Sequence, residues 1–176
     1  MNTFVSGAGR AMLSAACAAL LFGTTAAIAD DGKDNQSVAQ RLGGADGIAA
    51  FISAKVVPAL VASDIGHFFA GDPKPLTEST NQTVQCLARL LDHDLGGSSP
   101  KNGAIVSDPN AAPFPVQHQC RSSMSEVHRG MHINDAEFAL FINIVATEAT
   151  NAGVAADDVA AVGKVLGRFR GEITNK

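Results

Sequence analysis

The sequence lacks tryptophan and tyrosine, so its nine phenylalanines are the only large aromatic side chains. Such a chain absorbs little in the near ultraviolet, and it has no phenolic hydroxyl to donate a hydrogen bond. It also lacks an internal repeat and a basic stripe, because 13 Lys and Arg stand against 17 Asp and Glu, for a formal net charge of −4. A mildly acidic chain of this kind is not expected to bind nucleic acid.

The N-terminal apolar run, residues 11–22, is too short to span a bilayer. It follows a short basic region and precedes the small-residue tripeptide Ala27-Ile28-Ala29, which is typical of a secretory signal peptide cleaved before Asp30. We therefore expect residues 1–29 to be a signal peptide and residues 30–176 to form one domain, periplasmic or secreted. No stable membrane anchor remains after cleavage, and an uncleaved anchor is the alternative.

Cysteine is scarce, and only Cys86 and Cys120 remain after the expected cleavage. Disulfides persist in exported proteins, so an even pair favours a bridge; two unrelated thiols are the alternative. The bridge would close a loop of 34 residues. In the chain-entropy model, closing such a loop stabilises the fold by roughly 3–4 kcal/mol.

Apolar residues recur at helical spacing through most of the remaining chain, which predicts an all-α fold. The patterns predict a short helix from Val38, a second from about Ala45 with a kink at Pro58, and a third over residues 78–94. A fourth begins after Asn134, and a last one extends to Ile173, with Gly163 and Gly167 allowing a close approach. Residues 96–119 are rich in Gly, Ser, Pro and Asn, which predicts an inserted loop.

One stretch, Met124 to Phe138, carries the strongest local signals. Met124 and His128 lie four residues apart, so on a short helix both side chains share one face. Gly130 can end that turn with a left-handed residue, and Asn134 with a Glu three residues later reads as a capping box for the next helix. The pattern predicts a histidine held against a core, either as a packed side chain or as a ligand.

The same stretch resembles the proximal segment of the truncated haemoglobins, in which Met, an apolar residue, His, Gly, Ile, a helix cap and Phe follow at fixed spacing. The matching positions here are Met124, Val127, His128, Gly130, Ile133, Asn134 and Phe138. The Gly43-Gly44 pair after the first helix resembles the opening of that family. The resemblance covers about residues 38–173 and implies a group 1-like, two-over-two helical sandwich. It also implies haem b, with His128 as the axial iron ligand; no CxxCH motif for covalent attachment is present.

Further site residues follow from the resemblance alone. Phe68 and Phe69 match the apolar corner that packs on one haem edge, although a pair of core aromatics fits nearly as well. Gln82, with Glu78 or Gln85 beside it, matches the distal helix that lies over the iron; glutamines on such a helix are otherwise solvated. Met124 and Phe138 would line the proximal side. Arg129, beside His128, would pair with a haem propionate.

The sequence departs from the family on the distal side. Counted without gaps, the positions at which relatives carry Phe and Tyr fall on Lys55 and Val56. Many relatives hydrogen-bond iron-bound oxygen through that Tyr, so this chain must use another donor or none. Lys55, His67 and His93 are candidates for an internal sixth ligand, each with a plain surface role as its alternative.

The resemblance implies a protein that binds O₂, NO or CO at a haem iron, with a reductase as one further partner that it allows. Two alternatives stay open. One is a haem-free helical binding module in which His128 is structural. The other is an enzyme that uses the haem, such as an NO dioxygenase or a peroxidase.

Overall fold

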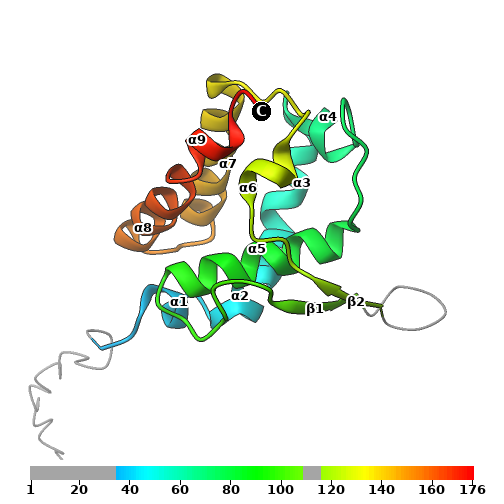
Figure 1. Cartoon of the computed structure of the whole chain (residues 1–176). Coiled ribbons are helices and arrows are strands. Elements are labelled where there is room, and N and C mark those ends of the chain that lie inside the picture. Colours follow the sequence, from blue (N-terminus) through cyan, green and yellow to red (C-terminus); the bar gives the residue numbers. More distant parts are fainter. Residues whose placement is uncertain (1–34, 109–115) are drawn as a thin grey trace, which may run out of the picture. The chain divides into compact units, whose positions relative to one another are not determined.

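The computed structural model describes residues 35–108 and 116–176, so the predicted signal peptide lies outside the described residues. Helices dominate this part of the chain (Figure 1). The first half contains α1 (Val38–Arg41), α2 (Gly44–Phe51), the π-helical turn η1 (Ile52–Val56), α3 (Val57–Val61), α4 (Gly66–Phe69) and α5 (Thr80–Asp94). The second half contains β1 (Ile105–Asp108), β2 (Val116–Gln119), α6 (Met124–His128), α7 (Asp135–Asn151), α8 (Ala156–Gly167) and α9 (Arg170–Ile173).

Two helix pairs form the core of the Gly32–Lys176 unit. α2 packs against α5, α7 packs against α8, and η1 contacts both α5 and α7. The apolar faces that the sequence predicts are buried together. This burial is the main stabilising contribution, because burying each large aliphatic side chain stabilises the fold by about 1.5–3 kcal/mol. Buried members of this cluster include Ile48, Ile52, Val56, Leu60, Val84, Ala88, Leu91, Val145, Val165 and Leu166. The all-α prediction is confirmed, apart from one small sheet.

Pro58 lies within a continuous helical segment, and the chain accommodates it by widening the turn before it. Residues 52–56 are π-helical, and the N–H of Val57 donates to the carbonyl of Ile52. A proline has no N–H and crowds the preceding turn, so a wider turn there removes the conflict. The same segment, residues 44–61, is long and apolar enough to cross a membrane. Here it packs against α5 and α7 as a core element.

The glycine pair Gly43-Gly44 makes the sharp turn between α1 and α2. Both residues have positive φ, +82° and +66°, a region that L side chains rarely adopt. Farther along the chain, Ser79 caps α5 and forms a capping box with Gln82. α5 therefore begins at Thr80, two residues later than predicted.

The predicted loop 96–119 is wrong at two short segments, because β1 and β2 pair in antiparallel register with Val106 opposite His118. Each strand has only four residues, and only β1 alternates between exposed and buried positions, so the pairing is hard to see in the sequence. Val106 and Asp108 turn inward, while Ile105 and Ser107 stay exposed. Asp108 accepts a hydrogen bond of 2.6 Å from the hydroxyl of Ser79, which ties the hairpin to the start of α5.

The prediction of one continuous last helix is also wrong, because the chain forms two helices, α8 and α9, separated at Arg168 and Phe169. The prediction that Gly163 and Gly167 allow a close approach is wrong. A Cβ atom at either position would meet nothing within 4 Å.

A disulfide joins Cys86 on α5 to Cys120, with the two Cα atoms 5.4 Å apart. Cys120 lies after β2, and its N–H donates to the carbonyl of Ala104. The bond thus connects α5 to the segment that leads directly into α6.

We expect the double variant Cys86→Ser, Cys120→Ser to lose roughly 3–4 kcal/mol of unfolding free energy, because the closed loop restricts the unfolded chain. Urea unfolding followed by far-ultraviolet circular dichroism measures this, since the chain has no Trp or Tyr to report by fluorescence. Wild type treated with reductant is the matched control and should lose the same amount. Equal stability of oxidised protein and double variant, or free thiols at both cysteines under oxidising conditions, would contradict the prediction.

Candidate functional site

α6 is a five-residue helix fixed at both ends. At its start the hydroxyl of Ser123 accepts from the N–H of Glu126. At its end Gly130 has a φ of +83°, as the sequence predicts. The carbonyl of Lys176 accepts from the N–H groups of Gly130 and His132, and α9 packs against α6. The position of α6 is therefore set by the C-terminal segment as well as by its own caps.

Asn134 caps the next helix as predicted. Its side chain accepts from the N–H groups of Ala136 and Glu137, and the Glu137 carboxylate accepts from the N–H of Asn134. This reciprocal pair fixes where α7 begins. The chain between His128 and α7 is thus held at both ends.

His128 is half-buried at the last residue of α6. Its Nδ1 lies 2.8 Å from the carbonyl oxygen of Met124. A carbonyl only accepts, so Nδ1 carries the proton and Nε2 keeps a free lone pair. Burial lowers the pKa of His128, the Met124 bond opposes this, and the positive charges of Lys74 and Arg121 lower it further. A neutral imidazole whose other nitrogen donates to a backbone carbonyl is the form that binds metals.

Lys74 contacts the last turn of α6 from a loop more than fifty residues earlier in the chain. Its ammonium donates to the carbonyl of Val127 at 2.8 Å and approaches the carbonyl of Glu126 at 3.4 Å. Sequence reasoning missed this residue, because nothing in its spacing links residue 74 to residue 128.

Glu78, which the resemblance put beside Gln82, is occupied by other contacts. Burial acts to raise its pKa, but hydrogen bonds from Thr77 and Arg121 outweigh burial and leave the pKa below its ordinary value. Arg121 forms an ion pair with Glu78 and donates to the hydroxyl of Thr77 at 3.1 Å. His118 lies 3.9 Å from the same carboxylate. These contacts join the loop before α5 to the segment before α6, close to the disulfide.

The predicted apolar contacts differ in their burial. Phe68 and Phe138 are 7% and 6% exposed, whereas Phe69 is 37% exposed. Met124 is half-buried, on the same short helix as His128. Arg129 is exposed at the C-cap of α6, and its pairing with a propionate stays a prediction.

The candidates for an internal sixth ligand lie in different places. Lys55 and His67 are exposed. The Nδ1 of His67 donates to the carbonyl of Asp64, and that of His93 donates to the carbonyl of Ser99. These two rings share the tautomer of His128, so the tautomer alone does not single out a ligand. His128 differs by its place on α6, beside the half-buried Met124.

On α5, the polar Gln82 and the apolar Leu87 lie on different sides of the helix. The carbonyl oxygen of the Gln82 side chain accepts from the N–H of Ser79 in the capping box, which leaves only its amide N–H free. At about 100° per residue, Gln82 lies about 140° around the helix from Leu87. Leu87 packs partly exposed against the core, and Leu90 lies on the same flank. The distal role of Gln82 stays a prediction, and Leu87 and Leu90 lie on the apolar side that the sequence predicts for this helix.

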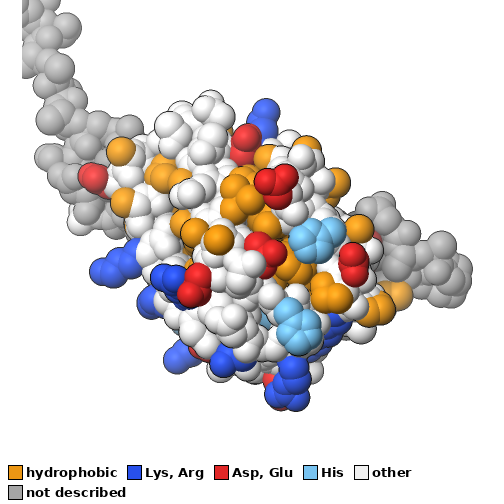
Figure 2. All heavy atoms as spheres, turned by 90° about the horizontal axis from the view of Figure 1, so that it is seen from above, with side chains coloured by type: hydrophobic (Ala, Val, Ile, Leu, Met, Phe, Trp, Pro, Cys, Tyr) orange, Lys and Arg blue, Asp and Glu red, His pale blue; other side chains and the backbone are white. Residues whose placement is uncertain are grey.

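Several large apolar side chains pack against the core while keeping part of their surface accessible. They come from α5, from the turn after α6 and from α7: Leu87, Met131, Ile133, Phe141 and Ile144. Figure 2 shows apolar side chains reaching the surface of one face, bordered by histidine and acidic side chains. Apolar side chains that gather at the surface of one face are typical of a ligand-binding surface.

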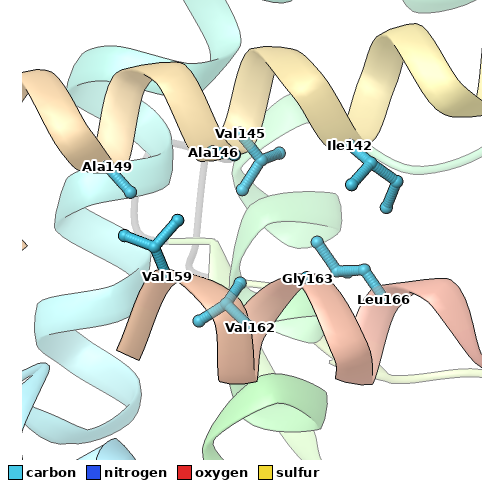
Figure 3. A pocket seen from close by; sticks show the side chains of 8 residues that line it. All are labelled: Ile142, Val145, Ala146, Ala149, Val159, Val162, Gly163 and Leu166. Carbon is cyan, nitrogen blue, oxygen red and sulfur yellow. The ribbon is translucent and has the colours of Figure 1, made fainter. Parts of the chain in front are cut away.

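Two hollows elsewhere do not suit a large planar ligand. Between α7 and α8, Val145, Val162 and Leu166 surround a cavity of about 10 Å³, which holds one water at most (Figure 3). A wider hollow of about 440 Å³ lies over Gly44, Asp92 and Gly97. Its lining is glycine and polar residues, whereas pockets for cofactors are mostly apolar.

No family model matches the sequence, and no curated protein matches it significantly. The fold is similar to the truncated haemoglobin of Tetrahymena pyriformis in its Fe(III) form (TM-score 0.56, 19% identity) and to a variant of it (0.60, 20%). It is also similar to the 2/2 haemoglobin of Synechococcus sp. PCC 7002, in the cyanomet state with covalently attached haem (0.57, 16%). Each comparison covers 80% of this chain and 100% of the other. This chain therefore has the two-over-two helical fold of the truncated haemoglobins, as its sequence predicted.

Proposed function

We propose that the protein binds haem b non-covalently, with Nε2 of His128 as the axial iron ligand, and binds a diatomic molecule (O₂, NO or CO) on the other side of the iron. The observation that carries this is the place of the half-buried His128 at the end of α6, where its Nδ1 donates to the Met124 carbonyl. This hydrogen bond fixes the neutral tautomer and leaves Nε2 available, which is the arrangement of an iron-bound histidine.

Partly accessible apolar side chains would suit an apolar porphyrin. Met124 shares α6 with the histidine, and Leu87 and Phe141 are large apolar side chains that pack against the core and keep accessible surface. Bound haem would supply the ligand-binding iron. The chain's own residues would orient the ring, exclude water from one face and hold the histidine neutral.

On the distal side, the proposed oxygen-binding chemistry differs from that of relatives with a Tyr. Val56, at one position where they carry an aromatic residue, is 1% exposed and belongs to the core. The remaining proposed donors are the side-chain amide N–H groups of Gln82 and Gln85. Without a donor, bound oxygen would lose on the order of 1–3 kcal/mol, which favours the less polar ligands NO and CO.

We expect haemin to bind the wild-type chain and His128→Gly to bind it at least about tenfold more weakly, since even partners of a metal ligand alter affinity by 10–100-fold. Added imidazole should restore the wild-type spectrum by filling the vacated space. Titration followed by the haem absorption band measures both effects. His132→Gly is the matched control, because His132 is exposed and has a φ of +55° that glycine accepts easily.

Two results would decide against this function. If His128→Gly binds haemin as tightly as wild type, another residue is the ligand. If the wild-type chain takes up no haem, the haem-free binding module is the correct alternative. Turnover of NO or peroxide by the loaded protein, with a reductase present, would instead favour the enzyme.

We further propose that the protein is exported, on the strength of the signal-peptide pattern in residues 1–29 and the Cys86–Cys120 disulfide. Expression of the full chain in a Gram-negative host should yield periplasmic protein whose first residue is Asp30. Intact-mass spectrometry of the periplasmic fraction measures this. Protein that stays in the cytoplasm with Met1 or Asn2 at its start would refute export.

A further inference from the structure

We propose that Lys74 is a positioning residue for the proximal histidine: held against the last turn of α6, its positive charge lowers the electron density that His128 donates to iron. This inference rests on the proposed haem binding. It goes beyond that proposal by assigning a role to a loop residue that the proximal segment does not contain.

The geometry places Lys74 at the end of the helix that carries the ligand. Its ammonium donates to the Val127 carbonyl at 2.8 Å, one residue before His128, and approaches the Glu126 carbonyl at 3.4 Å. The last carbonyls of a helix have no partner within the helix, so a cation there satisfies them and interacts favourably with the helix dipole. Lys74 is half-buried, which reduces screening of its charge by solvent.

Lys74 and Arg121 are the two cations that act on His128, and they differ in whether a carboxylate pairs with them. Arg121 is neutralised by its ion pair with Glu78. For Lys74, the hydrogen bonds found within residues 35–108 and 116–176 go to backbone carbonyls, and no ion pair with a carboxylate occurs there. Within the described residues, its positive charge is therefore not neutralised by a carboxylate, unlike that of Arg121.

The direction of the effect follows from Coulomb's law. A positive charge near the imidazole disfavours negative charge on the ring, so His128 donates less strongly to iron. The same charge disfavours ferric haem, which carries one more positive charge than ferrous haem. Removing it should therefore lower the iron reduction potential and strengthen the iron–histidine bond.

The test uses the haem-loaded full-length protein with Lys74→Met, which removes the charge, and Lys74→Arg, which keeps it. Lys101→Met is the matched control: Lys101 is exposed, lies between α5 and β1, and is not among the cations that act on His128. Spectroelectrochemistry gives the midpoint potential, and resonance Raman gives the iron–histidine stretch. We expect Lys74→Met to lower the potential and raise the stretching frequency. We expect Lys74→Arg and Lys101→Met to stay at wild-type values.

Each other outcome overturns a defined claim. If the wild type takes up haem but Lys74→Met shifts neither reading, or shifts no more than Lys101→Met, the role of Lys74 is wrong while haem binding stands. If Lys74→Arg shifts as far as Lys74→Met, the charge is not the cause and the inference fails. If the wild type takes up no haem, both proposals fall together. Should Lys74→Met not fold, by circular dichroism, Lys74→Gln replaces it as the uncharged variant.

Discussion

The hydrogen bond from His128 Nδ1 to the Met124 carbonyl is the contact on which this account depends. It sets the tautomer, orients the ring and leaves one nitrogen with its lone pair. The bond also requires that residues 124 to 128 stay helical, because donor and acceptor are one turn apart. The rest of the structure bears on function mainly by keeping this turn in place.

A helix of five residues cannot hold itself, since isolated helices need many more residues to be stable in water. α6 has no fully buried residue either, so its own packing contributes little. It is held instead by contacts from distant parts of the chain: the ammonium of Lys74, the carbonyl of Lys176 and the disulfide at Cys120. Two of these come from residues in or just before α5 and one from the last residue, so distant parts of the sequence fix this turn.

The sequence predicted the features that depend on local chemistry. The helix faces, the left-handed Gly130 and the cap at Asn134 each follow from a few neighbouring residues, and each is present. It did not predict the β1–β2 pairing or the break between α8 and α9, which depend on contacts between segments. Lys74 was missed for the same reason, because its partner carbonyls are far away in the chain. The sequence did not define which residues of α5 would face the iron, because a glutamine is equally common on any exposed side of a helix.

The proposed proximal and distal residues are thus supported by different kinds of observation. On the proximal side, the sequence spacing and the hydrogen bond of its ring both favour His128 as the proposed ligand. On the distal side, the capping box already engages one end of the Gln82 amide, and the flank with Leu87 is apolar. The fold is that of the truncated haemoglobins, but under the proposed function only glutamine amides remain as donors to bound oxygen. This difference is a reason to measure NO and CO beside oxygen.

Resonance Raman spectroscopy of the ferrous haem-loaded protein tests the central claim most directly, because the iron–histidine stretch reports the axial bond itself. We expect the band in wild type and its loss in His128→Gly, with a shifted band returning when imidazole is added. A band that survives unchanged in His128→Gly without imidazole would contradict the assignment of His128 as the iron ligand.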